Sequence, residues 1–445
     1  MKIIIAGAGE VGTHLAKMLC NENHDIVLLD ENEDKLNLIS SNLDLLTING
    51  SSTTINDLKE CGINSCELFI AVTPYEEQNM FSCILAKELG AQRTIARIDH
   101  QEYLYPQNME RFIKLGVDEL IYPEHLAAKE IVTSLKQTTT RQIHEFSGGK
   151  LVLFGIKIRD NAQIVNKSLE ITASENDFSF RAVAITRESK TIIPQGKDLI
   201  LPEDIVYFVA QPSDVQKILD ISGKKPFDVK NVMILGGSRI AQKTAKRLGD
   251  NFNIKILEID REKSLKLADR LEDVLVINGD GRDLDLLREE GIDKMDAFIA
   301  LTGNSETNIL SCQIAKKFGV RRTVAEVENI DYINLAENTG IGRVINKKLI
   351  AASKIYEYTI NAEVAHVKCL STSEAEVMEF IAKPGSKITT KPIRELSFPD
   401  DATIGGIIRS DRGYIANGNM EIEEGDKVVI FALPSALRKL SKFFN

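Results

Sequence analysis

Three glycines near the start of the chain have the spacing of a phosphate-binding loop. The segment "IIIAGAGEVG" places Gly7, Gly9 and Gly12 in a G-x-G-x-x-G pattern, after an apolar run and at the start of a helical pattern. The first glycine permits a tight turn, the second lets backbone amides approach a pyrophosphate, and the third allows close helix–strand packing. The first helical N–H groups then face the anion. A bare structural turn is the alternative. The residues expected to form this nucleotide loop are Gly7, Ala8, Gly9, Glu10, Val11 and Gly12.

Further polar residues are expected to complete this first site. Asp30 closes the apolar run "DIVLLD", where a carboxylate suits a ribose 2′-OH. A 2′-phosphate would meet that carboxylate, so NAD(H) is favoured over NADP(H), while ATP and ADP remain possible. Arg97 interrupts an apolar run and is suited to phosphate oxygens, with a structural salt bridge as the alternative. Thr73 and Pro74 follow the fourth apolar run and are expected to line the same crevice.

A second, altered loop begins in the middle of the chain, in the segment "GGSRIA". Ser238 stands in the position of the close-approach glycine, and Glu258 takes the ribose-binding position of Asp30. Arg239 replaces Glu10 and is suited to a terminal phosphate. This pattern predicts a second nucleotide site that is weaker or tuned to another nucleotide, with an empty structural copy as the alternative. Its expected residues are Gly236, Gly237, Ser238, Arg239, Ile240 and Glu258.

The elements that must hold these two loops are repeated along the chain. The segments "AVTPYEEQNMFSCILAKELG" (71–90) and "ALTGNSETNILSCQIAKKFG" (300–319) align at an offset of 229. A shorter segment, 192–210, aligns with 414–432 at an offset of 222. Internal repeats of this kind indicate a duplicated architecture. The chain is therefore expected to be a tandem of two units, each with a large and a small domain.

The large domains alternate short apolar runs with amphipathic segments, which favours parallel sheets covered by helices on both faces. The predicted fold class is α/β: tandem Rossmann-like, doubly wound parallel sheets, each followed by a small α+β lobe. The expected domains are residues 1–137 (nucleotide-binding), 143–222 (small lobe), 229–358 (altered loop) and 363–445 (small lobe).

Composition and motifs narrow the classes of function. The formal net charge of −10 argues against nucleic acid as a partner. The absence of a signal-peptide pattern and of a long uncharged apolar stretch favours a cytoplasmic chain that does not span a membrane. The six histidines are dispersed, and no metalloprotease, nucleophile-elbow or Walker-lysine motif occurs. We therefore expect no enzyme; an NAD-dependent oxidoreductase with duplicated Rossmann domains is the alternative.

The quoted loop, the run "LLDENEDKL" and the segments "AVTPYEEQNM", "IARI" and "IYPE", arranged as a tandem, resemble the TrkA family. These are cytosolic regulatory subunits of Trk-type potassium uptake systems, built from RCK (KTN) domains. The resemblance covers essentially the whole chain. It implies a homotetrameric ring of eight RCK units beneath a potassium-translocating Trk membrane subunit, associated peripherally with the inner face of the membrane.

The same resemblance implies ligands. NAD(H) is expected at the first site, and ATP or ADP at either site, with binding that shifts the ring between shapes that open or close a pore. Related regulators hold a divalent cation at the glutamate of an "HPE"-like stretch. Glu124 in "YPE" is the candidate here, whereas Lys348 occupies the corresponding position of the second copy.

Overall fold

The computed structural model of the protein describes residues 1–20, 24–136, 143–188, 190–223, 227–359, 364–369 and 375–444. The chain divides into two compact units, Met1–Leu135 with Val229–Thr359, and Lys136–Asp228 with Ile360–Asn445. We call the two repeated parts of the first unit the large lobes and those of the second unit the small lobes. The expected domain limits at residues 137, 363 and 445 lie outside the described residues.

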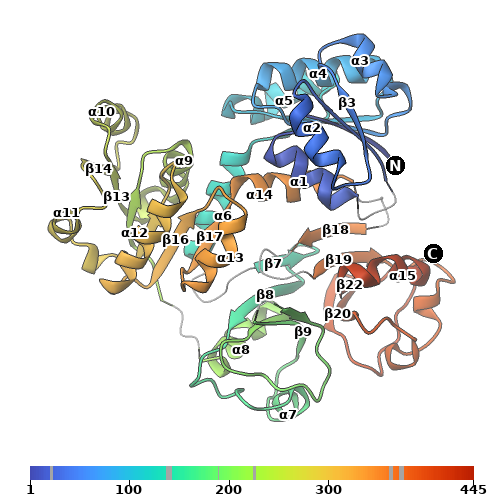
Figure 1. The fold of residues 1–445 in the computed structure, drawn as a ribbon. Coiled ribbons are helices and arrows are strands. Elements are labelled where there is room, and N and C mark those ends of the chain that lie inside the picture. Colours follow the sequence, from blue (N-terminus) through green and yellow to red (C-terminus); the bar gives the residue numbers. More distant parts are fainter. Residues whose placement is uncertain are drawn as a thin grey trace. The chain divides into compact units, whose positions relative to one another are not determined.

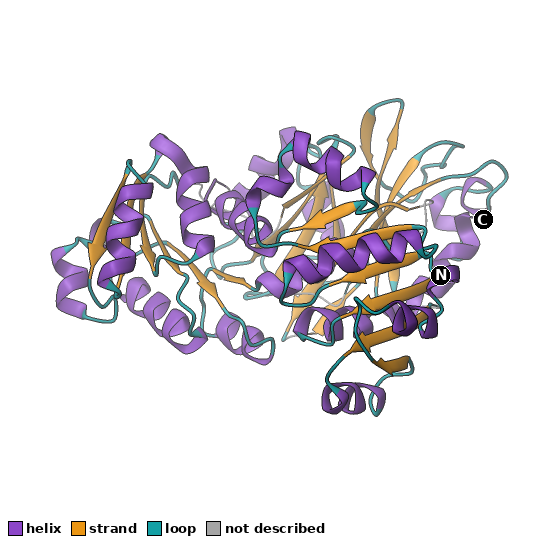
Figure 2. Ribbon diagram, turned by 90° about the horizontal axis from the view of Figure 1, so that it is seen from above, coloured by secondary structure: helices purple, strands orange, loops and turns teal. Residues whose placement is uncertain are grey.

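The first large lobe is a parallel sheet with strand order β3-β2-β1-β4-β5-β6 and helices on both faces (Figures 1 and 2). The strand order reverses between β1 and β4, which is where doubly wound sheets bind ligands. Its elements are β1 (Lys2–Ala6), α1 (Glu10–Leu19), β2 (Asp25–Asp30), α2 (Glu33–Ser40), β3 (Leu46–Asn49), α3 (Ile55–Glu60), β4 (Leu68–Ala71), α4 (Glu76–Glu88), β5 (Arg93–Arg97), α5 (Pro106–Lys114), β6 (Glu119–Ile121) and α6 (Pro123–Lys136).

The central strands of this sheet are apolar along their whole length because both faces are covered. Ile3, Ile4 and Ile5 in β1 are all 0% exposed. Such uninterrupted apolar runs are typical of parallel sheets, whereas a sheet with one wet face alternates apolar and polar residues. On one face, Phe69 of β4 packs in a cluster with Cys83 of α4. The alternation of runs in the sequence thus arises from burial between two helical layers.

The second large lobe repeats this topology, with strand order β14-β13-β12-β15-β16-β17 and parallel pairing. The predicted tandem of Rossmann-like sheets is therefore confirmed. Its elements are β12 (Asn231–Leu235), α9 (Arg239–Leu248), β13 (Asn253–Glu258), α10 (Arg261–Arg270), β14 (Val274–Asn278), α11 (Leu284–Glu289), β15 (Ala297–Ala300), α12 (Ser305–Lys317), β16 (Arg322–Glu326), α13 (Asp331–Asn338), β17 (Arg343–Ile345) and α14 (Lys347–Tyr356).

The two large lobes exchange their last helices. Helix α14 of the second lobe packs against α1 of the first (Figure 1). Helix α6 of the first lobe contacts α9 of the second, where Arg247 Nη2 lies 2.6 Å from His125 Nε2. Both exchanged helices carry two small residues and an isoleucine on their buried faces, all at most 1% exposed: Ala127, Ala128 and Ile131 in α6, and Ala351, Ala352 and Ile355 in α14. Small side chains at these positions let the helices approach closely.

Each small lobe is built on an antiparallel sheet, with strand orders β10-β9-β11-β8-β7 and β18-β19-β22-β20-β21. The two sheets bury one continuous apolar cluster between them, to which Phe146 and Tyr207 contribute from the first and Phe431 from the second. Their elements are β7 (Ile143–Phe146), β8 (Leu151–Lys157), α7 (Leu169–Ser174), β9 (Phe180–Arg187), β10 (Lys190–Ile192), β11 (Ile205–Ala210), α8 (Val215–Ile221), β18 (Val364–Cys369), β19 (Glu376–Ile381), β20 (Ala402–Arg409), β21 (Arg412–Ile415), β22 (Lys427–Ala432) and α15 (Pro434–Phe444).

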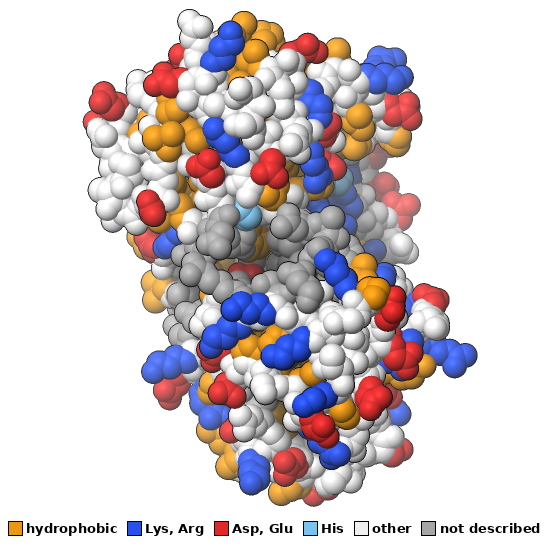
Figure 3. Space-filling model, turned by 90° about the vertical axis from the view of Figure 1, so that its right-hand side faces the viewer, with side chains coloured by type: hydrophobic (Ala, Val, Ile, Leu, Met, Phe, Trp, Pro, Cys, Tyr) orange, Lys and Arg blue, Asp and Glu red, His pale blue; other side chains and the backbone are white. Residues whose placement is uncertain are grey.

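Two properties of the molecule bear on its partners. Within the described ranges, no helix combines the length and the hydropathy needed to cross a bilayer. On the face shown in Figure 3, Lys and Arg side chains are interspersed with Asp and Glu side chains, so neither sign of charge dominates that face.

The close approach of α1 to the turn after β1 requires a glycine at position 12. A Cβ atom on Gly12 would lie 1.9 Å from the carbonyl oxygen of Gly7. Gly12→Ala is therefore expected to lower the free energy of unfolding by about 2 kcal/mol, because the backbone must move apart. Urea denaturation measures this change. Gly9→Ala is the matched control, since a Cβ there meets nothing within 4 Å. Equal losses in the two variants would contradict the packing argument.

Candidate functional site

The first glycine loop joins β1 to α1 where the strand order reverses. Gly7 adopts a φ of +112°, which favours glycine. The backbone amide of Ala8 donates to Asp30 Oδ2 at 2.6 Å, and Asn32 N donates to Asp30 Oδ1 at 2.9 Å. The structure thus brings the predicted ribose-binding acid and the predicted phosphate loop together at the carboxyl edge of the sheet.

The second loop repeats this arrangement with a longer acid. Gly236 has a φ of +90°, and the amide of Gly237 donates to Glu258 Oε2 at 2.8 Å. Lys263 Nζ lies 2.6 Å from the same oxygen. Burial by itself raises the pKa of Glu258, but hydrogen bonds from Lys263 and from the backbone amides of Asp260 and Gly237 outweigh it, and the pKa lies below its ordinary value. Glu258 is therefore held as a carboxylate.

Ser238 explains why the second fingerprint lacks its middle glycine. Its backbone is extended, with φ −62° and ψ 168°, close to the −74° and −177° of Gly9. Any residue adopts this conformation, so the chain geometry does not require glycine here. The Ser238 hydroxyl accepts a hydrogen bond from the amide of Ala241 at 3.3 Å. The serine is a helix cap, and it engages an amide that would otherwise be available to an anion.

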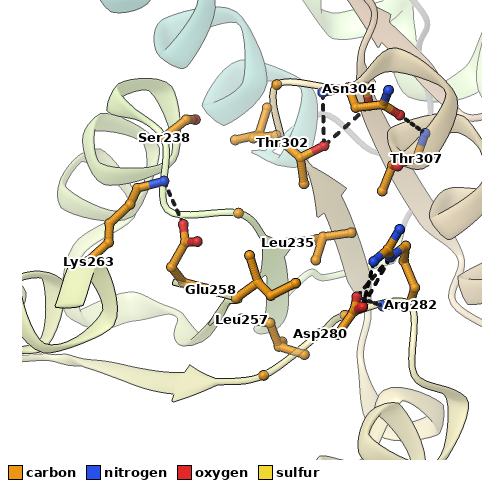
Figure 4. Close-up of a pocket in the computed structure, with 16 residues that line it drawn as sticks. Leu235, Ser238, Leu257, Glu258, Lys263, Asp280, Arg282, Thr302, Asn304 and Thr307 are labelled. Atoms are coloured by element: carbon orange, nitrogen blue, oxygen red, sulfur yellow. Dashed lines mark hydrogen bonds and ion pairs between the residues drawn. The ribbon is translucent and has the colours of Figure 1, made fainter. Parts of the chain in front are cut away.

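A cavity of about 400 Å³ opens beside the second loop (Figure 4). This volume lies within the range of small-molecule sites. Of the residues predicted for the second site, Gly236, Ser238 and Glu258 line it. The other lining residues come from the carboxyl ends of β12, β13 and β15 and from the segments that follow β13, β14 and β15: Leu235, Leu257, Ile259, Lys263, Gly279, Asp280, Gly281, Arg282, Leu301, Thr302, Gly303, Asn304 and Thr307.

Two cations of this cavity were not predicted from the sequence. Lys263 forms an ion pair with Glu258. Arg282 donates hydrogen bonds to the carboxylate of Asp280, from Nη2 to Oδ2 at 2.7 Å and from Nε to Oδ1 at 3.0 Å. The available signal was the replacement of "NGSSTT" (49–54) by "NGDGRD" (278–283) after the third strand of each sheet. Each of these cations is paired with an acid that also lines the cavity, so the four side chains together carry no net charge. Glu326 stands at the position of Arg97.

A buried asparagine in each lobe was also missed. Asn79, which is 1% exposed, accepts from Thr73 N at 2.9 Å and donates to Arg97 O at 3.0 Å. Asn308 makes the equivalent bonds, to Thr302 N at 3.0 Å and to Glu326 O at 2.8 Å. Each side chain ties the loop after the fourth strand to the end of the fifth. The sequence does contain a clue to this role, because an asparagine stands at the same position in both copies of the longest repeat.

The other residues predicted for the two sites lie either in or near the loops or at the contact between the two large lobes. Val11 and Ile240 are buried in their helices, 7% and 2% exposed. Thr73 lies on the Asn79 network described above, with Pro74 directly after it. Arg97 Nη2 lies 3.5 Å from Asp99 Oδ1, a local ion pair.

Arg239 does not line the cavity but faces the first large lobe, 3.7 Å from Asp99 Oδ2 and 3.6 Å from Glu124 Oε1. Glu124 is 4% exposed, and its Oε2 has no hydrogen-bond partner among the described residues. In the described ranges, His, Cys, Asp and Glu side chains form no group of three or more that could hold a metal ion. At the predicted cation position, Glu124 thus lies beside the guanidinium of Arg239, which Asp99 also approaches.

Comparison with known proteins defines the class of the molecule. The family model of the TrkA-N domain matches residues 3–123 and 232–347, which are the large lobes, and that of the TrkA-C domain matches 153–223 and 377–445, the small lobes. The chain is thus a tandem of two TrkA-N and two TrkA-C domains.

Full-length relatives extend this result. The Trk system potassium uptake protein TrkA of Vibrio alginolyticus is 33% identical over 439 residues, covering 97% of this chain and 95% of that protein. The TrkA homolog 2 of Methanosarcina mazei is 30% identical over the full length of both chains. The chain belongs to the TrkA family, and the resemblance drawn from its sequence is confirmed.

Solved structures share the fold at lower identity. The RCK domain of GsuK superposes with a TM-score of 0.62 at 16% identity, covering 100% of this chain and 94% of that one. The GsuK channel bound to NAD gives 0.61 at 16% identity, covering 100% of this chain and 78% of that one. This likeness places both large and both small lobes in the RCK fold.

The state of Glu258 gives a pH-dependent prediction. Its folded pKa lies below the ordinary value of 4.5. Its contribution to stability is therefore complete above pH 4.5 and is lost as the pH falls through the lower folded pKa. Glu258→Gln should lower the free energy of unfolding by about 1 to 3 kcal/mol at neutral pH, and by progressively less in acid. Urea unfolding at several pH values measures this. The exposed Glu262→Gln is the control, and a pH-independent cost of Glu258→Gln would contradict the assignment.

Proposed function

We propose that the chain is a nucleotide-responsive regulatory subunit of a Trk-type potassium uptake system. One observation carries this proposal: each glycine loop begins a helix whose first side chain forms an ion pair with the exchanged helix of the other lobe. Glu10 opens α1 and pairs with Lys348 of α14 at 2.6 Å. Arg239 opens α9 and lies 3.6 Å from Glu124 of α6. A ligand on either loop therefore lies beside the contact between lobes.

The ion pair at the first loop continues into the second lobe. Lys348 Nζ is 3.5 Å from Glu328 Oε2, and Lys347 lies 2.6 Å from Glu328 Oε1 and 3.4 Å from the buried Glu326. A phosphate placed beside Glu10 adds negative charge at one end of this series. A nucleotide changes the balance between two conformations only by its difference in affinity for them. About 1.4 kcal/mol of difference gives a tenfold change per site.

The residues present fit nucleotides of different kinds. At the first loop, Asp30 is suited to the free ribose hydroxyls of NAD(H), and the opening amides of α1 to its pyrophosphate. The cavity of the second lobe, with Glu258 for a ribose and Lys263 and Arg282 for phosphates, suits ATP or ADP. Binding energy would then act on conformation, and we propose no catalytic step.

The proposed setting follows from the relatives. Proteins that match essentially the whole chain carry the name of the Trk potassium uptake system. We propose that this chain docks from the cytoplasmic side on a potassium-translocating Trk membrane subunit, and that four copies form a ring of eight RCK units. The structural likeness to a channel's RCK domain supports this arrangement.

Nucleotide binding can be tested by calorimetric titration of the purified chain with NADH, NAD, ATP and ADP. Asp30→Ala should abolish the first binding event and Glu258→Ala the second. Each substitution removes the proposed acceptor for the ribose hydroxyls and the acceptor of the hydrogen bond from the loop amide. Glu33→Ala and Glu262→Ala are matched controls, since both are exposed acids in the first turn of the next helix of each lobe. Two titrations left unchanged by Asp30→Ala and Glu258→Ala would rule out these sites.

Regulation can be tested in cells. Deletion of the gene should reduce potassium uptake, measured as rubidium influx, and wild-type chain should restore it. Asp30→Ala should restore it incompletely or without a response to the cellular nucleotide state, whereas Glu33→Ala should restore it fully. Uptake that does not depend on the chain in either direction would refute the regulatory role.

A further inference from the structure

The contacts between the two large lobes are reciprocal in position and inverted in charge. The equivalence of positions is fixed by the sheets: Glu119 of β6 pairs with Ile95, and Arg343 of β17 pairs with Val324, the residue at offset 229 from Ile95. The exchanged helices α6 and α14 each begin four residues after these positions, at residues 123 and 347. Position 124 therefore corresponds to 348, and 130 to 354.

The first reciprocal contact joins the opening residue of one loop helix to the second residue of the exchanged helix. From the first lobe, Glu10 meets Lys348 at 2.6 Å. From the second lobe, Arg239 occupies the position of Glu10 and meets Glu124 at 3.6 Å. The same two positions thus form both ion pairs, with the acid always in the first lobe and the base always in the second.

A second set of equivalent positions shows the same inversion of sign, with an ion pair between the lobes in one of its two contacts. In the other, Lys354 pairs with Glu357 of its own lobe. Glu130 of α6 forms an ion pair with Arg343 of β17. The corresponding positions are Lys354 and Glu119. Glu119 Oε2 accepts a hydrogen bond from the Tyr358 hydroxyl at 3.0 Å, and Lys354 Nζ lies 5.4 Å from the centre of the same ring. All four positions are acidic in the first lobe and basic in the second: Glu10, Glu119, Glu124 and Glu130 against Arg239, Arg343, Lys348 and Lys354.

Several of these charges are shielded from water. Glu124, Arg343 and Lys348 have side-chain exposures of 5%, 12% and 21%. Charges in such positions are screened less by salt than charges on an open surface, so a wrong sign costs more. In a reciprocal interface, each contact occurs twice. A pair of identical lobes would therefore place Glu10 against Glu124 twice, or Arg239 against Lys348 twice.

We infer that this charge inversion selects the partner of each large lobe, so that a first lobe pairs with a second lobe and not with another copy of itself. The two lobes have the same fold, and their exchanged helices present similar apolar faces, which do not distinguish the pairings. Specificity of this kind is a difference in binding free energy between the pairing of unlike lobes and the pairing of like lobes. Repulsion between like charges in a pair of like lobes provides that difference.

The test reverses one side of the first contact at a time in the full-length chain. Glu10→Lys with Glu124→Lys makes both lobes basic at these positions, and Arg239→Glu with Lys348→Glu makes both acidic. Each double variant should melt roughly 4 to 8 °C below wild type, because two attractions become repulsions. The fourfold variant restores opposite signs with the lobes' roles exchanged, and it should melt above either double variant. It should stay below wild type, because Asp99 and Glu328 then face the acids introduced at positions 239 and 348. A fourfold variant no more stable than the doubles would overturn the inference.

Pairing itself is measured by producing the basic and acidic double variants together, each with a different affinity tag. Lobes of opposite sign then lie on different chains, so two-tag purification should recover more mixed assemblies than it does from two differently tagged wild-type chains. The two differently tagged wild-type chains serve as the control, because they measure how many mixed assemblies form through other surfaces of the chain. Recovery of mixed assemblies only at the wild-type level, or double variants that melt with wild type, would show that these charges do not select the partner.

Discussion

The hydrogen bond between the first glycine turn and the acid of the neighbouring strand fixes the geometry on which both large lobes depend. Ala8 N donates to Asp30, and Gly237 N donates to Glu258, at 2.6 and 2.8 Å. Each bond anchors the residue that follows a glycine of positive φ, and so sets where α1 and α9 begin. The opening side chains of those helices, Glu10 and Arg239, are the ones that contact the opposite lobe.

The same carboxylates serve the loop and the proposed ribose contact. An ionised carboxylate has about four acceptor positions on its two oxygens, so it can keep a loop amide and accept from a hydroxyl as well. Glu258 already accepts from two backbone amides and from Lys263. About one acceptor position is then left for a ribose hydroxyl at Glu258. Ligand binding and loop position are thus coupled through one side chain in each lobe.

Local patterns predicted what depends on neighbours in the sequence. The alternating apolar runs gave the parallel sheets because their strands are buried on both faces, and the glycine and acid spacing located both loops. The sequence did not reveal where Arg239 points, because its partners Asp99 and Glu124 become neighbours only after the lobes exchange helices. Lys263 and Arg282 were missed for a related reason: the cavity they line is assembled from segments after three different strands. The phosphate role expected of Arg239 remains a prediction.

The shared apolar cluster of the small lobes has a consequence for how the protein behaves on dilution. Phe146, Tyr207 and Phe431 are all 0% exposed because the two sheets cover each other. In a protein with one unit per chain, such a core would form only by association of two chains, and it would come apart at low concentration. Here both sheets belong to one chain, so their encounter is intramolecular. This pairing is therefore independent of how many copies of the protein a cell contains.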